Sequence, residues 1–285
     1  TNPNLFEQPL DDFETTNLYD IVITEGWPGG FLKYDKSMLK KMSSFVKVGG
    51  LLLISFFPPI GGLPTYLRRL LAYRLISDEK SNEEKTYTLK SAFSSHLKNL
   101  LSMGRSQEHW IQDSLLNPYI CVAHNTPLLC EEILDKNFKI YNSVPKFCND
   151  WRWYKSLHGH QRNFNDHFIS EYNSISHCMI DYKMNVSIRE KEKNINLENL
   201  CFKFASVTKN NELLGYDAYI QNVQPLLLNI IDNLKNDLDV NTLKGLTEVD
   251  NLLKQKKFQI SDISNMFYFS SLFGREQCYL SFTNE

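Results

Sequence analysis

The chain lacks the cysteine spacing and the long apolar runs that define several protein classes. No two of its six cysteines form a CxxC pair; they are Cys121, Cys130, Cys148, Cys178, Cys201 and Cys278. Such wide spacing fits neither a zinc site nor a disulfide framework, so reduced thiols and a cytoplasmic location are expected. No apolar run reaches the roughly 18 to 20 residues of a membrane-spanning helix, so no membrane partner is expected.

An excess of charge of either sign is also missing. The chain has 31 Lys and Arg against 33 Asp and Glu, and 42% of its 285 residues are hydrophobic. Because binding to phosphates needs a basic face, nucleic acid is not an expected partner. The best local basic cluster is Arg68, Arg69 and Arg74 on a predicted helix over Tyr66–Ile76. We interpret it as a solvated helix face.

Several sequence signatures of catalysis and metal binding are absent. The chain has neither a P-loop, G-x-x-x-x-G-K-[ST], nor a nucleophile motif G-x-S-x-G, which disfavours other nucleotide-using α/β enzymes. His158 and His160 lie two residues apart, as metal ligands on a strand can. No carboxylate or cysteine follows at ligand spacing, so no metal site is predicted.

The most informative stretch is Leu18–Gly62, which reads as strand, loop, helix and second strand. The β-branched run Tyr19–Thr24 predicts a strand buried on both faces, and Leu51–Phe57 predicts another. Ligands bind beyond the carboxyl ends of parallel strands, where this chain has the loops Glu25–Gly30 and Pro58–Gly62. Alternatively, glycine and proline only end the strands there.

The segment between these strands predicts one helix. Asp35 and Ser37 are candidate N-caps, and Gly49–Gly50 is the expected stop signal. The apolar residues that follow helical spacing are Met38, Leu39, Met42, Phe45 and Val46. Further along, residues 77–90 predict an exposed loop before a helix over Leu89–Met103, in which His96 is assigned to the core or its boundary.

The motifs YDIVIT and GGLLLIS, with the loop and helix between them, resemble strands four and five of class I S-adenosylmethionine-dependent methyltransferases. The resemblance implies an α/β fold, namely a partial Rossmann-like methyltransferase sheet (strands 4 to 7) with a helical insertion. Lys139–Phe147 would be the sixth strand. Gln277–Phe282 would be the seventh, which in this family returns antiparallel between strands five and six.

The chain departs from the family pattern at its beginning. Members of the family start with a strand and a Gly-rich loop that opens a helix, followed by a strand that ends in an acidic residue. Nothing before Asp20 matches either feature. We therefore expect the sequence to be the C-terminal part of a longer protein, with the main cofactor cradle outside it.

The resemblance also implies which residues contact the cofactor S-adenosylmethionine. The segment before the fourth strand carries a polar residue beside the adenine, which assigns this position to Glu7 or Gln8. The tip of the fourth strand faces the sulfonium and the substrate, which assigns Glu25, Gly26 and Trp27 to the methionine end.

Residues 105–118 resemble the lid over the substrate pocket of small-molecule methyltransferases, and Asn117 is a candidate substrate contact there. His109 and Asp113 are four residues apart and share one face if the segment is helical. A neutral imidazole can accept a proton, so the pair is a candidate general base with its orienting group. A polar helix cap is the alternative.

An aromatic cluster opens the next region. Trp151 and Trp153 are candidate acceptor contacts, because ligand pockets combine apolar walls with few polar groups. The cluster could equally be the seam between insertion and sheet.

Three ranges are expected: 1–149, the C-terminal half of a methyltransferase domain with its lid; 150–265, a helical insertion for substrate or dimerisation; and 266–285, the returning strand. The insertion has predicted helices over Phe164–Tyr182, Leu213–Leu234 and Val240–Lys254, and Arg189–Lys193 is interpreted as a solvated hinge.

Two functions follow from these patterns. The first is methyl transfer from S-adenosylmethionine to a small-molecule or sugar-linked acceptor, by a chain that could be inactive as the isolated fragment. The second is a non-catalytic methyltransferase-like module that binds a protein partner through its helical insertion.

Overall fold

The computed structural model describes residues 6–25, 36–76, 81–100, 103–117, 137–210 and 216–285. Its backbone contacts divide the chain into two units. The sheet unit comprises Thr1–Phe56, His124–Tyr172 and Cys278–Glu285, and the helical unit comprises Phe57–Ala123 and Asn173–Gln277. The division differs from the three expected ranges, because 57–123 groups with the later helices.

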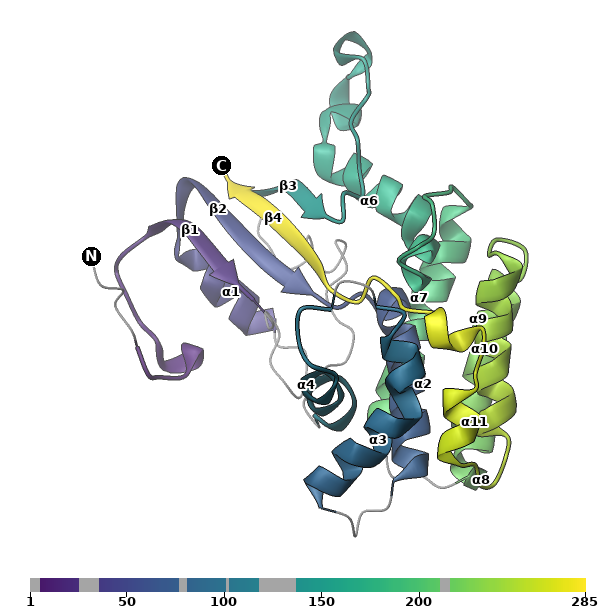
Figure 1. Ribbon diagram of the computed structural model, residues 1–285. Helices are drawn as coiled ribbons and strands as arrows, with labels where there is room; N and C mark the ends of the chain where they lie inside the picture. The colour runs from purple at the N-terminus through teal and green to yellow at the C-terminus, as the bar shows by residue number, and fades with distance from the viewer. Residues whose placement is uncertain (1–5, 26–35, 77–80, 101–102, 118–136, 211–215) are drawn as a thin grey trace. The chain divides into compact units, whose positions relative to one another are not determined.

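The sheet unit contains a four-stranded mixed sheet in the order β1-β2-β4-β3 (Figure 1). The parallel pair is β1 (Tyr19–Thr24) and β2 (Val46–Phe56). The strand β4 (Cys278–Asn284) lies between β2 and β3 (Phe138–Val144) and is antiparallel to both. An antiparallel strand near the end of the chain was expected at Gln277–Phe282, and the structure has it there.

The face of β1 is more open than its sequence predicts. Ile21 and Ile23 are 58% and 61% exposed, so the prediction of a strand buried on both faces was wrong for the described chain. Ile21 and Ile23 lie two residues apart and so point to the same face of β1, which is the face left open among the described residues. Thr24, at the end of β1, is buried.

The helix α1 (Lys36–Ser44) follows, with Leu39 and Met42 buried as expected. The expected stop signal was wrong, because the helix ends before Gly49–Gly50 and β2 has already begun. Gly49 has φ of +79° and lies where the pairing of β1 with β2 shifts register. Ser37 lies inside the helix and is not its cap, whereas Asp35 lies outside the described residues.

The core of the sheet unit continues from β3 onto α6 (Phe164–Ile175). The Phe147 ring packs edge-on against Phe168 and Tyr172, with ring centroids 6.1 and 5.1 Å apart. The Asn165 side chain accepts a hydrogen bond of 2.8 Å from the backbone N–H of Ile140 in β3. These contacts attach α6 to the strand that precedes it.

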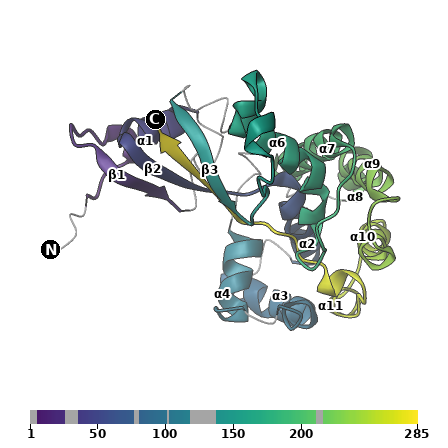
Figure 2. The same ribbon diagram turned by 90° about the horizontal axis from the view of Figure 1, so that it is seen from above.

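The helical unit is built around α2 (Pro59–Leu75), whose side chains from Pro59 to Ala72 are all buried. Its neighbours include α7, and Figures 1 and 2 both show α9 beside α10. None of the described helices is long and apolar enough to cross a bilayer. The remaining helices are α3 (Asn82–Leu97), α4 (Gln107–Ile111), α7 (Lys191–Asn210), α8 (Tyr216–Ala218), α9 (Gln224–Leu234), α10 (Val240–Leu253) and α11 (Ile260–Ser264).

Several helix boundaries differ from the sequence prediction, among them the start of α2 at Pro59, inside the predicted loop Pro58–Gly62. The helix α3 begins at Asn82, inside the predicted loop 77–90, because Ser81 and Glu84 form a capping box that satisfies the first turn. The helix α7 includes most of the predicted hinge Arg189–Lys193, so that prediction was wrong. The helices expected over Phe164–Tyr182 and Val240–Lys254 are present, the first ending in a 3₁₀ turn at Ser176–Ile180.

The interpretation of the basic cluster as a solvated face was also wrong. Arg68 is 0% and Arg69 5% exposed. Arg69 donates hydrogen bonds of 3.1 Å to the backbone carbonyls of Ser114 and Asn117. Arg189, from the predicted hinge, is buried too and pairs with Asp237 at 2.9 Å. Burial is tolerated because these guanidinium groups have carbonyl or carboxylate partners.

The glycines after β2 have a packing role in the structure. A Cβ built on Gly61 would lie 2.1 Å from the carbonyl oxygen of Arg275, and one built on Gly274 would lie 2.0 Å from the oxygen of Gly61. Two backbones therefore meet at a distance that excludes any side chain. This contact joins the first turn of α2 to the chain just before β4.

Gly61→Ala is expected to destabilise the helical unit by about 2 kcal/mol, because the added methyl group overpacks against backbone that cannot move aside. Chemical denaturation followed by circular dichroism measures the change. Gly104→Ala is the matched control, since a Cβ there meets nothing within 4 Å. Equal stability of the two variants would contradict the proposed close packing.

Candidate functional site

Among the hollows lined by described residues of the helical unit, two are large enough for a small molecule. The first, called here the Glu276 pocket, has a volume of about 820 Å³. It is lined by Leu100, Met103, Gly104, Arg105, Trp110, Tyr182, Glu276 and Gln277. The second, called here the Asp181 pocket, has a volume of about 550 Å³ and is bounded by the turn 181–184, the start of α10 and residues 267–272.

Arg275 fixes the wall of the Glu276 pocket. Its backbone N–H donates to the carbonyl of Met179 at 2.8 Å. Its guanidinium donates to the carbonyls of Asp181, Tyr182 and Met184 at 3.0, 2.8 and 3.0 Å. These bonds tie the turn that carries Tyr182 to the strand entry that carries Glu276. The two side chains therefore reach one hollow although they are far apart in the sequence.

Glu276 is the carboxylate that lines this pocket. Its Oε2 accepts a hydrogen bond from the Thr65 hydroxyl of α2. Burial raises the pKa of Glu276, although the Thr65 hydroxyl and the charge of Arg68 both act to lower it. A carboxylate whose pKa is raised in a pocket is a candidate proton acceptor for a ligand.

Arg68 supplies the buried positive charge near Glu276. It donates hydrogen bonds to the carbonyls of Leu272 at 2.8 Å and Phe269 at 3.1 Å. The guanidinium carbon lies 4.6 Å from the Phe269 ring centroid and 3.8 Å from that of Phe273. Burial lowers the pKa of Arg68 to about 9, so the side chain remains a cation at neutral pH.

The predicted lid also contributes residues to the wall of the pocket. It folds as α4 followed by a π-helical turn at Gln112–Leu116, and Trp110 from α4 is buried and lines the pocket. The Arg105 guanidinium forms an ion pair with Asp113 and approaches the Ser114 hydroxyl at 3.4 Å. The charge of Arg105 is thus largely offset within its own segment.

The candidate base pair is not brought together as a hydrogen-bonded unit. His109 and Asp113 lie on consecutive helical turns, and both are exposed. The Asp113 carboxylate instead forms an ion pair with Arg105. Asn117 contributes its backbone carbonyl to Arg69. Of the predicted lid, the side chains that line the pocket are Arg105 and Trp110, which sequence reasoning did not select.

The other predicted site residues lie in the sheet unit. Trp151 and Trp153 are 92% and 63% exposed, and they line neither of the two hollows. Glu25, at the end of β1, is exposed and accepts a hydrogen bond of 3.2 Å from the Tyr279 hydroxyl of β4. Its predicted neighbours Gly26 and Trp27 lie outside the described residues. Glu7 and Gln8 are exposed.

Glu276 was missed by the sequence analysis although a signal for it existed. It stands two residues before β4, and Cys278 at the start of β4 pairs with Phe56 at the end of β2. The signal is therefore a carboxylate at the entry of a predicted strand.

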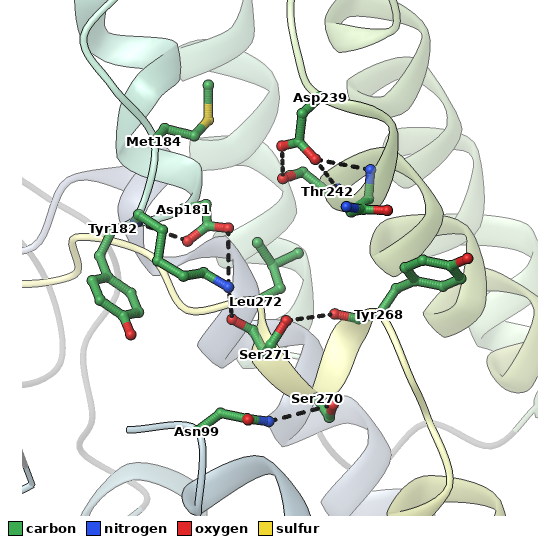
Figure 3. Close-up of polar contacts among 12 residues, drawn as sticks. Asn99, Asp181, Tyr182, Met184, Asp239, Thr242, Tyr268, Ser270, Ser271 and Leu272 are labelled. Carbon is green, nitrogen blue, oxygen red and sulfur yellow. Dashed lines mark hydrogen bonds and ion pairs between the residues drawn. The ribbon is translucent and has the colours of Figure 1, made fainter. Parts of the chain in front are cut away.

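The Asp181 pocket is more polar and its groups are engaged with one another (Figure 3). Lys183 donates to the carbonyl of Ser271 at 2.7 Å and, through its backbone N–H, to Asp181 at 3.0 Å. Asp239 caps α10 by accepting from the backbone of Asn241 and Thr242 at 2.8 and 3.1 Å. Burial raises the pKa of Asp181, whereas the hydrogen bond from Lys183 lowers it. These polar groups therefore already have hydrogen-bond partners within the protein, and their arrangement does not call for a ligand.

A third cluster combines a buried histidine with two possible nucleophiles. His177 Nε2 lies 3.0 Å from the Ser187 hydroxyl, and the Cys178 sulfur lies 3.5 Å from the same nitrogen. The Asn194 amide settles the tautomer, because its oxygen accepts from Arg189 at 2.6 Å and its nitrogen faces His177 Nδ1 at 3.4 Å. The proton therefore sits on Nε2.

This tautomer has a chemical consequence. A catalytic serine needs an unprotonated Nε2 to accept its hydrogen, whereas the His177 Nε2 donates to Ser187. Burial lowers the pKa of His177 to about 4. We interpret the cluster as a structural contact between the 3₁₀ turn and α7. Within the described ranges, no three His, Cys, Asp or Glu side chains are placed to hold a metal ion.

The chain was compared with protein-family models, curated proteins and solved structures, and none of them matches it.

Proposed function

We propose that the protein transfers a methyl group from S-adenosylmethionine to a small-molecule acceptor, which binds in the Glu276 pocket. The observation that carries the proposal is the strand order β1-β2-β4-β3, in which the last strand runs antiparallel between its two neighbours. The family that the sequence resembles places its seventh strand in the same way between strands five and six.

The positions of the candidate residues support the same proposal. Glu25 is at the carboxyl end of β1, and its exposed carboxylate suits an ammonium or hydroxyl group of a ligand. Glu25 therefore lies at the end of a strand at which α/β proteins bind ligands. Glu276 lines a pocket of the helical unit and is the candidate contact for the acceptor.

Methyl transfer mainly requires the protein to position the acceptor. The bound cofactor would supply an activated methyl group, and the protein must hold the acceptor atom in line with it. Glu276 would orient an acceptor N–H or O–H and take its proton as the new bond forms. The apolar walls of the Glu276 pocket would contact the body of the acceptor.

The proposal is tested by calorimetric titration of S-adenosylhomocysteine into the protein expressed from its natural coding sequence. We expect saturable binding that Glu25→Ala weakens. Asp20→Ala is the control, because Asp20 is an exposed carboxylate on the same strand, paired with Lys47. No binding by the natural protein would overturn the proposal and favour the non-catalytic module that binds a protein partner.

A further inference from the structure

We propose that the Glu276 pocket selects acceptors that carry an amine on a flat or apolar body, with the nitrogen held by the Glu276 carboxylate. The inference rests on the proposed function for the role of the amine as methyl acceptor: the bound ammonium group would pass one proton to the Glu276 carboxylate, which leaves a lone pair on the nitrogen to attack the methyl group. The selectivity of the pocket for amines can be measured without any methyl transfer.

The shape and walls of the pocket indicate the body of the ligand. Its volume of about 820 Å³ is within the range of small-molecule sites. Leu100, Met103, Trp110 and Tyr182 provide aliphatic and aromatic surface, and Figure 3 shows the Tyr182 ring on the other side of its turn from Asp181. Such walls bind apolar or aromatic groups and contribute little to hydrogen bonding.

The charges that line the pocket indicate the functional group. Glu276 and Arg105 are the two charged side chains among the lining residues. Arg105 is paired with Asp113, so its charge is already offset. Oε2 of the Glu276 carboxylate accepts a hydrogen bond from the Thr65 hydroxyl. A ligand that enters the pocket therefore meets a carboxylate oxygen, Oε1, that can accept a hydrogen bond.

Arg68 does not take the place of such a ligand. Its guanidinium lies over the rings of Phe269 and Phe273, and it donates hydrogen bonds to the carbonyls of Pro64, Phe269 and Leu272. The influence of Arg68 on Glu276 is outweighed by burial, because the pKa of Glu276 is raised in spite of it. A cationic ligand would offset the remaining cost of burying the Glu276 carboxylate charge, which the charge of Arg68 offsets only in part.

The aromatic walls add to the preference for amines. An ammonium group is attracted to the face of a tryptophan or tyrosine ring, more strongly where water is excluded. A carboxylate ligand would instead be repelled by Glu276, and an alcohol would form a hydrogen bond without the charge. The expected order of affinity is therefore amine, then alcohol, then carboxylate.

The experiment compares three probes that share one body: benzylamine, benzyl alcohol and benzoate. Each is titrated into the complete ¹⁵N-labelled chain near pH 7, and chemical shifts report the affinity. We expect benzylamine to bind about tenfold more tightly than benzyl alcohol, as a charge-assisted hydrogen bond predicts. Benzoate should show no saturable binding.

Two variants test whether Glu276 causes the preference for benzylamine. Glu276→Gln should reduce the affinity for benzylamine to that for benzyl alcohol, whereas Asp232→Asn should change nothing, because Asp232 is an exposed carboxylate paired with Lys235. Equal affinity for the three probes, or tighter binding of benzoate, would overturn the proposal even if Glu276→Gln does not fold. Binding of S-adenosylhomocysteine is measured separately, so failure of amine selectivity and failure of the methyltransferase proposal give different results.

Discussion

Arg68→Ala is expected to lower the free energy of unfolding by about 4 kcal/mol, because it removes a fully buried charge together with its partners. The side chain is 0% exposed and donates hydrogen bonds to the carbonyls of Phe269 and Leu272. Alanine would leave these carbonyls without their donor and open a cavity between Phe269 and Phe273. It would also leave Glu276 without its buried positive neighbour.

Urea denaturation followed by circular dichroism measures this loss. Arg105→Ala is the control, because it removes an arginine from a partly exposed ion pair, and such pairs contribute roughly 0 to 1 kcal/mol. Arg68→Met keeps most of the volume and separates packing from charge. A loss for Arg68→Ala no larger than that of the control would contradict the central role given to Arg68.

The parts of the fold that were predictable are those with a local signal. The β-branched run of β1 and the apolar run of β2 identify two strands, and the change to helical spacing between them identifies α1. The final strand, β4, could be placed only because the family resemblance supplies a position for it. The exposed face of β1 was not predictable, since an apolar pattern does not show whether another element covers that face of the sheet.

The buried arginines show why the rest was missed. A cation in a helical pattern is normally solvated, and the partners that make burial tolerable come from distant parts of the chain. Arg68 bonds to carbonyls about 200 residues later, and Arg189 to Asp237. Glu276 gains its environment in the same way, from Thr65 of α2 and the walls of its pocket. No local pattern contains this information.

The candidate base pair illustrates a different limit. Helical spacing correctly predicts that His109 and Asp113 lie on adjacent turns, but it does not predict what else competes for the carboxylate. Arg105, eight residues before Asp113, takes that place. The pocket is then built from the neighbours of the selected residues. Residues 105–118 were thus correctly selected as a segment, whereas the side chains of this segment that line the pocket, Arg105 and Trp110, were not.

Acidification from pH 7 to pH 5 is expected to lower the free energy of unfolding, because each of two buried histidines contributes a loss of about 2 kcal/mol. His96 is 0% exposed and its Nε2 lies 2.9 Å from the carbonyl oxygen of Ile263. Burial, assisted by the charge of Arg68, lowers the pKa of His96 to about 3. Burial likewise lowers the pKa of His177, which is 1% exposed, to about 4.

The sign follows from the preference of the folded state for neutral imidazole. An unfolded histidine titrates near pH 6.5, so the stabilisation is complete above that pH and is lost as the pH falls toward 4 and then 3. Glu276 and Asp181 act in the opposite direction, because burial raises their pKa values. Urea denaturation at pH 7 and pH 5 measures the net change. The double variant His96→Gln, His177→Gln should lose most of the dependence on pH, and an unchanged dependence would show that other groups cause it.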